Sequence, residues 1–172
     1  MRIIRDRRIV EDDWIVIPAD ADALPASGKL IIPLKRWLEQ RDMLVARAQD
    51  GERLGVWLKT DEEPAGLTDD LHRLPLIAVN FPRFADGRGY STAFLLRQRY
   101  GFKGELRAIG DVLRDQLFYL QRVGFNAFAM RAGKDIEDAL KALDDFSETY
   151  QASADQPVPL FRRRAAAIGK LA

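Results

Sequence analysis

Residues 76–81, Leu76-Ile77-Ala78-Val79-Asn80-Phe81, form the most apolar of several short runs that recur along the middle of the chain. A run of this length and composition predicts a central, buried strand. After a loop rich in glycine, arginine and aspartate, apolar residues spaced along Thr92–Tyr100 predict a helix, with Gly101 just beyond its end. Residues 76–101 therefore predict one strand–loop–helix unit.

The same order recurs on both sides of this unit. Further strands are predicted at Lys29–Leu34, Leu54–Leu58, Glu105–Ile109 and Phe125–Met130. Further helices are predicted at residues 37–48, 65–74, 112–123 and 136–146. Such alternation indicates parallel strands joined by right-handed crossovers, and about 120 residues are too few for a closed eight-fold barrel. We therefore expect an α/β fold with an open, mainly parallel sheet, or a partial barrel, of about five βα units.

The 172 residues fit one domain, with an N-terminal arm or hairpin at 1–28, a βα core at 29–150 and a C-terminal tail at 151–172. Within the first part, residues 12–18 predict a short strand that proline stops. The apolar residues Ile3, Ile4 and Trp14 would suit a homodimer contact. They would equally suit an edge strand of the same chain.

The composition excludes several functions. Lys and Arg total 27 and Asp and Glu total 26, so the formal net charge is +1. Binding to a phosphate backbone needs an excess of basic residues on one face, so we expect no nucleic-acid partner. No apolar run approaches the length of a membrane span or a signal peptide, so we expect a cytoplasmic protein without membrane contact.

The chain has no cysteine and one histidine, His72. It therefore has no thiol nucleophile, iron–sulfur cluster or Cys/His zinc site. A Ser/His/Asp triad would have to use His72, which lies in a segment that predicts a surface helix. Neither a dinucleotide fingerprint nor a Walker loop is present. We expect no metal and no cofactor, and we assign no catalytic residue.

In a parallel α/β fold, ligands bind beyond the carboxyl ends of the strands. The loop Asn80–Ser91 lies at such an end and contains the most unusual polar residues of the chain. Its glycines leave amide groups free to approach an anion, Ser91 can cap the following helix, and Arg88 adds a fork of donors. Alternatively, Asp86 and the glycines form a tight turn, Arg88 pairs with Asp86 or Asp111, and Tyr90 packs on Phe81.

The next predicted strand contributes two further candidates. Glu105 and Arg107 lie on the same side of this strand, and a charged pair in a central strand is costly unless each charge finds a partner. Arg107 therefore either pairs with a carboxylate such as Asp86 or is directed at a ligand. Asp111 is expected to cap the following helix. The candidate anion site comprises Arg83, Asp86, Gly87, Arg88, Gly89, Ser91, Arg107 and Asp111.

These stretches resemble the bacterial DUF934 family. The residues on which the resemblance rests are Phe81-Pro82-Arg83-Phe84, Asp86-Gly87-Arg88-Gly89-Tyr90-Ser91, Leu95-Leu96-Arg97, Gly104-Glu105-Leu106-Arg107-Ala108, Gly110-Asp111-Val112-Leu113, Asp115-Gln116-Leu117 and Gly124-Phe125. Pro33-Leu34 with Trp37, Phe146-Ser147 with Tyr150-Gln151, and Pro159-Leu160-Phe161 extend the resemblance over about Lys29 to Arg163.

The resemblance implies a role in assimilatory sulfite reduction. Members of the family are commonly labelled as oxidoreductases of that pathway, because their genes lie beside those for sulfite or nitrite reductase and phosphoadenylylsulfate reductase. No catalytic residues are carried over. Where many members have Arg-Cys-Gly-Phe-Asp, this chain has Arg122-Val123-Gly124-Phe125-Asn126, which favours a structural role for that turn.

Two hypotheses follow. In the first, the protein is an accessory that binds the sulfite or nitrite reductase, or its electron donor, without catalysis of its own. The tail Pro159–Arg164, an apolar anchor with a basic patch, would then dock on an acidic redox partner. The alternative for the tail is a solvated terminus, or one that packs on its own domain. In the second hypothesis, the protein is an oxidoreductase or an enzyme that holds a small oxyanion or phosphorylated ligand.

Overall fold

The computed structural model describes residues 1–168. Its strands are β1 (Arg2–Arg5), β2 (Arg8–Glu11), β3 (Trp14–Val16), β4 (Lys29–Pro33), β5 (Leu54–Lys59), β6 (Leu76–Phe81), β7 (Glu105–Gly110) and β8 (Ala127–Phe128). Its helices are α1 (Leu34–Glu39), α2 (Arg41–Gln49), α3 (Arg88–Gln98), α4 (Leu117–Arg122), α5 (Ile136–Lys141) and α6 (Leu160–Ile168). Short 3₁₀ turns lie at η1 (Pro64–Leu67), η2 (Arg114–Gln116) and η3 (Ala142–Asp144).

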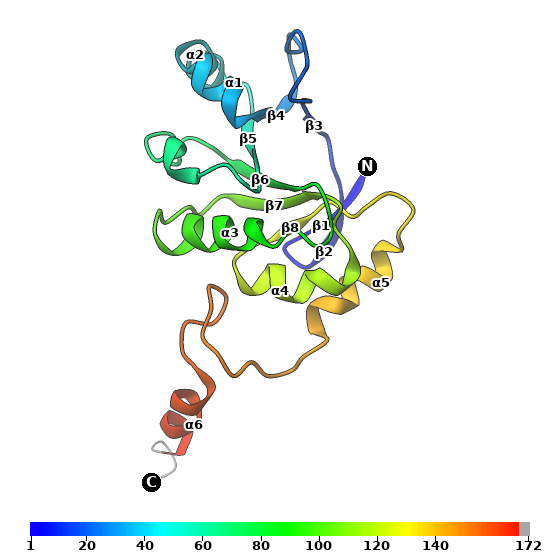
Figure 1. Cartoon of the computed structure of the whole chain (residues 1–172), viewed down its shortest axis with the longest axis vertical. Helices are drawn as coiled ribbons and strands as arrows, with labels where there is room; N and C mark the ends of the chain where they lie inside the picture. Colours follow the sequence, from blue (N-terminus) through cyan, green and yellow to red (C-terminus); the bar gives the residue numbers. More distant parts are fainter. Residues whose placement is uncertain (169–172) are drawn as a thin grey trace.

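All the strands form one sheet in the order β2-β1-β8-β7-β6-β5-β4-β3 (Figure 1). The run from β3 to β8 is parallel throughout, whereas β1 is antiparallel to both β2 and β8. The sheet is curled into a half-barrel. The prediction of a mainly parallel sheet or partial barrel, preceded by an N-terminal hairpin, is therefore confirmed.

The hairpin belongs to the domain itself. Its turn residues Asp6 and Arg7 have φ of 48° and 62°, as in the two-residue turns whose twist matches that of the flanking strands. Ile3 and Ile4 are fully buried within the same chain. Ile3 and Ile4 therefore pack within the same chain, as one of the two interpretations predicted, and do not form an exposed surface for a homodimer contact.

The curling brings the two edges of the sheet together. The edge strands β2 and β3 are consecutive in the sequence and are separated only by Asp12 and Asp13. Three Cα–Cα steps span at most about 11 Å, so the ends of the edge strands that this link joins cannot lie farther apart. The sheet therefore encloses a concave inner face, which the link crosses.

The two faces of the sheet are covered differently. The outer face packs against the helices and supplies most of the core, including Trp37 of α1 and Leu96 of α3. A second apolar cluster consists of strand residues and Ala129, which directly follows β8: Ile3, Ile31, Trp57, Leu76, Ala78, Ile109 and Ala129. Because side chains alternate along a strand, this second set lines the concave inner face.

Several predicted helices have different boundaries. The helix predicted at residues 65–74 is only the 3₁₀ turn η1 followed by turns. Here the buried carboxylate of Asp70 accepts hydrogen bonds from Trp37 Nε1 and Arg41 Nε, both at 2.9 Å. This tertiary pairing overrides the weak local preference for helix. The helix predicted at residues 136–146 consists of α5, which ends at Lys141, and the 3₁₀ turn η3, which ends at Asp144.

Candidate functional site

The loop before α3 is held by its own side chains. The Asp86 carboxylate accepts hydrogen bonds from Arg88 Nε at 3.0 Å and Arg88 Nη2 at 2.8 Å, and from Thr60 Oγ1 at 2.6 Å. It also accepts from the backbone N–H of Arg88, the first residue of α3, at 3.2 Å. The helix thus begins four residues before the predicted Thr92, and Ser91 lies exposed inside α3 rather than capping it.

Contacts around this turn explain why the loop contains Gly89 and Tyr90. A Cβ at Gly89 would lie 2.7 Å from the Phe81 ring, so Gly89 allows α3 to approach β6 closely. The rings of Phe81 and Tyr90 pack edge to face with centroids 5.8 Å apart. These contacts are the ones expected if the loop forms a tight turn in which Arg88 pairs with Asp86 and Tyr90 packs on Phe81. Binding of an anion by the loop stays a prediction.

The ion pair changes the acidity of Asp86. The hydrogen bonds from Arg88, and then from Thr60, hold the pKa of the Asp86 carboxyl well below its usual range. A group with a lowered pKa contributes stability that is present above its unfolded pKa, about 3.9, and is lost as the pH falls through its folded pKa. This contribution therefore disappears only in strong acid.

Arg88→Ala is expected to raise the pKa of Asp86 toward the value of an unpaired carboxyl, because the largest cause of the depression is removed. A carboxyl-detected NMR titration measures this pKa directly. Arg83→Ala is the matched control, because Arg83 lies on the same loop, is exposed and forms no ion pair within residues 1–168. An unchanged pKa in Arg88→Ala would show that the ion pair does not form in solution.

Arg107 lies on the inner face, away from this loop. Its Nη1 and Nη2 atoms each donate to the Asp12 carboxylate at 2.9 Å, and its Nε donates to Glu105 Oε1 at 2.7 Å. The side chains of Arg107 and Asp12 are 1% and 2% exposed. The partner of Arg107 is therefore Asp12 rather than Asp86, and its donors are already used within the protein.

The prediction that Asp111 caps the following helix is wrong. Its carboxylate accepts from the backbone N–H of Phe84 at 3.1 Å and pairs with Arg131 Nη1 at 3.2 Å. The role at the start of the next helical segment is taken by Gln116, whose side chain accepts from the N–H of Leu113 at 2.9 Å. Asp111 therefore joins the loop before α3 to the segment after β8.

The predicted anion-site residues thus fall into separate places. Asp86, Gly87, Arg88 and Gly89 lie together at the start of α3, and Arg83 lies exposed on the same loop. Asp111 contacts this loop through the backbone, whereas Arg107 faces the opposite side of the sheet. Of the three candidate arginines, Arg83 and Arg88 are open to solvent, whereas Arg107 is buried.

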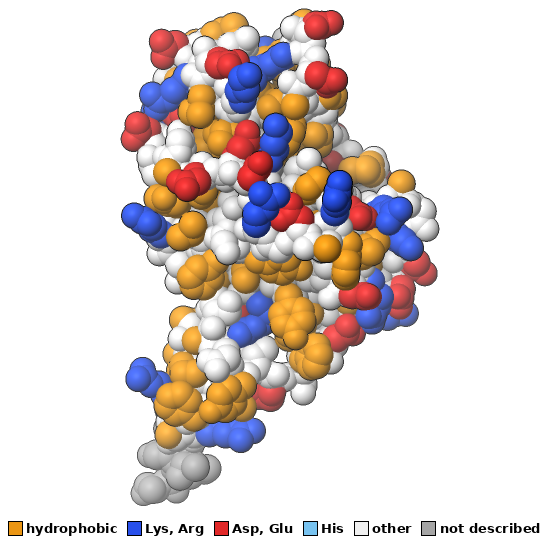
Figure 2. All heavy atoms as spheres, in the orientation of Figure 1, with side chains coloured by type: hydrophobic (Ala, Val, Ile, Leu, Met, Phe, Trp, Pro, Cys, Tyr) orange, Lys and Arg blue, Asp and Glu red, His pale blue; other side chains and the backbone are white. Residues whose placement is uncertain are grey.

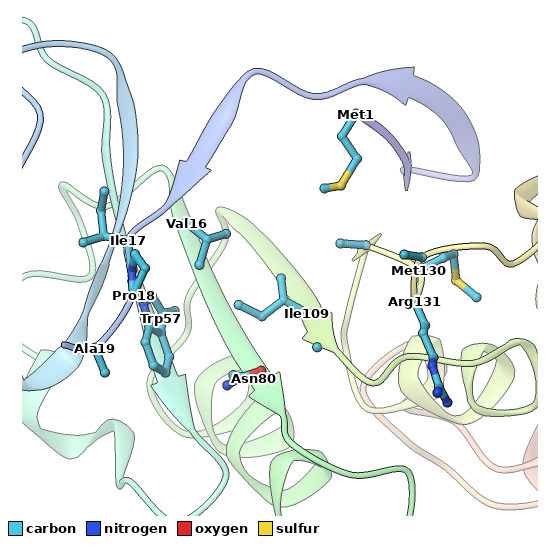
Figure 3. Close-up of a pocket in the computed structure, with 13 residues that line it drawn as sticks. Met1, Val16, Ile17, Pro18, Ala19, Trp57, Asn80, Ile109, Met130 and Arg131 are labelled. Carbon is cyan, nitrogen blue, oxygen red and sulfur yellow. Dashed lines mark hydrogen bonds between the residues drawn. The ribbon is translucent and has the colours of Figure 1, made fainter. Parts of the chain in front are cut away.

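Sequence reasoning missed a cavity on the inner face. It has a volume of about 520 Å³ and opens where β5, β6, β7 and β8 end (Figure 3). Its walls include Trp57 and Ile109 from the strands and Val16 and Ile17 from β3 and the residue after it. The alternation of side chains along each strand indicates which residues face inward. The cavity could be predicted only with the curvature of the sheet as well.

The C-terminal segment, residues 145–168, extends away from the body of the domain and ends in α6 (Figure 1). We call this segment the arm. It is attached through Arg122, which donates to Asp155 Oδ1 at 2.8 Å and to Thr149 Oγ1 at 3.1 Å. Large apolar side chains are exposed along it and on the adjoining helix α4: Tyr119 (59%), Phe146 (56%), Tyr150 (65%), Val158 (42%) and Phe161 (58%).

The described part of the chain lacks two features. Residues 1–168 contain no group of three or more His, Asp or Glu side chains placed to hold a metal ion. Among these same residues, no helix is long and apolar enough to cross a membrane.

A family model described as "Bacterial protein of unknown function (DUF934)" matches residues 55–161, which is more than half of the chain. The chain belongs to the DUF934 family. A search of the curated proteins finds no match to it. The matched region begins in β5 and ends in α6, so it contains the loop before α3, Arg107 and most of the arm.

The turn in which this DUF934 member departs from the pattern expected of the family is held by hydrogen bonds. Asn126 Oδ1 accepts from the backbone N–H of Leu106 at 2.8 Å and from Arg97 Nη2 at 3.1 Å. Its Nδ2 donates to Asp6 in the hairpin turn at 2.9 Å. These contacts join β7, α3 and the hairpin, as expected for a structural role of this turn.

Proposed function

We propose that this DUF934 protein is a cytoplasmic accessory of assimilatory sulfite reduction that binds the sulfite or nitrite reductase, or its electron donor, without catalysis of its own. The observation that carries the proposal is the arm, which extends from the domain with exposed aromatic side chains. The pathway itself rests on the family resemblance. The arm supplies the means of binding.

The side chains of the arm suit a protein partner. Contiguous exposed apolar side chains with a polar rim are characteristic of interaction surfaces, and aromatic and arginine residues provide most binding hot spots. Figure 2 shows hydrophobic side chains gathered on the arm with basic groups beside them. Arg163 pairs with Glu148 at 3.1 Å, whereas Arg162 and Arg164 are exposed and form no ion pair within residues 1–168. These two charges favour an acidic partner.

The charged residues of the candidate anion site form ion pairs within the chain, and this favours binding of a partner over catalysis. Arg107 pairs with Asp12, Arg88 with Asp86, and Asp111 with Arg131. An oxyanion enzyme requires donors directed at the reacting group, and these donors are directed at carboxylates of the same chain.

The proposal predicts that Tyr150→Ala combined with Phe161→Ala weakens binding to purified assimilatory sulfite reductase at least tenfold, because both aromatic side chains are exposed on the arm. Biolayer interferometry with the immobilised reductase, alone and with its electron donor, measures the affinity. Phe94→Ala is the control, because Phe94 is 42% exposed on α3, outside the arm. Equal affinity of all variants would exclude docking through the arm.

A second candidate function is an oxidoreductase or an oxyanion-binding enzyme, and the exposed Arg83 and Arg88 on one loop are the observation that favours it. A thermal-shift screen with sulfite, sulfate, adenosine phosphosulfates and flavin tests this candidate. Stabilisation by any of them that Arg88→Ala abolishes would favour the enzyme over the accessory.

A further inference from the structure

The cavity on the inner face is a formed site at the position where parallel α/β folds bind ligands. It lies at the carboxyl ends of β5 to β8, and about 520 Å³ is within the usual range for small-molecule sites. Its walls are mainly apolar, with Val16, Ile17, Trp57, Ile109, Ala129 and Met130 among them. Indole Nε1 of Trp57 donates to the carbonyl oxygen of Ile17 at 2.8 Å, so this wall is held in place before any ligand arrives.

One polar side chain in this lining is free to recognise a ligand. The amide of Asn80 makes no hydrogen bond with any residue of the described chain, and Figure 3 shows it extending toward Trp57. It lies against Gly110, where a Cβ would come within 2.5 Å of its Oδ1 atom. An amide offers both a donor and an acceptor to a polar group of a ligand.

The charges around the cavity are paired. The guanidinium of Arg131 is directed away from the cavity in Figure 3 and pairs with Asp111 at 3.2 Å. The amino group of Met1 lies 3.7 Å from Glu11. An ionic ligand would lose its hydration and find no free countercharge, so these surroundings favour a neutral ligand.

We propose that this cavity binds a neutral, largely apolar small molecule, one polar group of which hydrogen-bonds the amide of Asn80. The site goes beyond the proposed docking function and is independent of it, because it uses the inner face of the sheet rather than the arm. A small molecule is favoured over a partner's surface because the site is a concave pocket between strands of a single domain.

Two dyes with the same aromatic skeleton test the proposal. N-phenylnaphthylamine is neutral, whereas anilinonaphthalene sulfonate carries a negative charge, and both fluoresce more strongly in an apolar environment. We expect saturable binding of the neutral dye to the full chain and at least tenfold weaker binding of the sulfonate. Asn80→Leu should weaken the neutral dye by about two- to tenfold, the effect of one lost hydrogen bond. Equal affinity for both dyes would overturn the proposal.

Filling the cavity locates the dye. Ala129→Phe should abolish binding of the neutral dye, because Ala129 lines the cavity, whereas Ala46→Phe on the exposed side of α2 should leave it unchanged. If Ala129→Phe does not fold, Val16→Trp fills the mouth from a position that is 40% exposed. The arm variant Tyr150→Ala with Phe161→Ala should bind the dye normally. Binding that survives filling, or that disappears with the arm variant, would contradict the assignment.

Discussion

Asp12→Ala is expected to lower the free energy of unfolding by about 3–5 kcal/mol, because it leaves the Arg107 guanidinium buried without its principal partner. Asp12 lies in the link between the edge strands and Arg107 in the middle of the sheet, and both side chains are almost completely buried. Their ion pair thus joins the closing link to β7 across the inner face. Urea denaturation of the purified protein measures the loss.

Two further variants determine whether the unpaired charge is the cause. Asp12→Leu combined with Arg107→Met removes both charges, and we expect it to cost less than Asp12→Ala alone, because the buried guanidinium is gone and Glu105 keeps Arg5 as a partner at 3.7 Å. Asp13→Ala is the matched control, because its ion pair with Lys29 is exposed to solvent and should contribute far less to stability than the buried pair. A double variant at least as unstable as Asp12→Ala would show that the unpaired charge of Arg107 is not the cause of the loss.

Gly110→Ala is expected to cost about 3 kcal/mol or more, because two separate penalties coincide at this position. Gly110 has a φ of 93°, which L-residues rarely adopt. A Cβ there would also lie 2.4 Å from the carbonyl oxygen of Phe81, a backbone atom that cannot move away by rotating a side chain. The thermal midpoint and the urea midpoint should both fall.

Substitutions at two other glycines separate the cost of the backbone conformation from the cost of the close approach. Gly133 has a φ of 79° but open space around it, so Gly133→Ala should cost only about 1–2 kcal/mol from the backbone conformation. Gly87 has a φ of −81° and no atom within 4 Å of an added Cβ, so Gly87→Ala carries neither penalty and should change stability by no more than about 1 kcal/mol, because the entropic gain opposes the preference for Gly over Ala at the start of α3. Equal effects at the three positions would show that the close approach at Gly110 has no energetic consequence.

The parallel sheet could be predicted because its signal is local. Each short apolar run, such as that of β6, is followed by a polar loop and usually by a segment with helical periodicity, and repetition of this order leaves few topologies. The helix predicted at residues 65–74 was wrong because a distant contact decides that segment. The Asp70 carboxylate accepts from Trp37, which lies 33 residues away in the sequence.

The candidate site was less predictable for the same reason. The pairing of Arg107 with Glu105 follows from the alternation of a strand, but its pairing with Asp12 joins residues 95 positions apart. The inner cavity depends on how far the sheet curls, which no local pattern encodes. The exposure of Phe146, Tyr150 and Phe161 likewise depends on the path of the arm away from the domain.

Site-specific photo-crosslinking to the purified sulfite reductase, alone and with its electron donor, determines whether the arm contacts a partner. A photoreactive phenylalanine analogue replaces Phe161 on the arm in one sample and Phe94 on α3 in another, both exposed positions. If the arm docks on the partner, position 161 crosslinks to the reductase or its donor and position 94 does not. No crosslink from position 161, or equal crosslinking from both, would contradict the claim that the arm binds the partner.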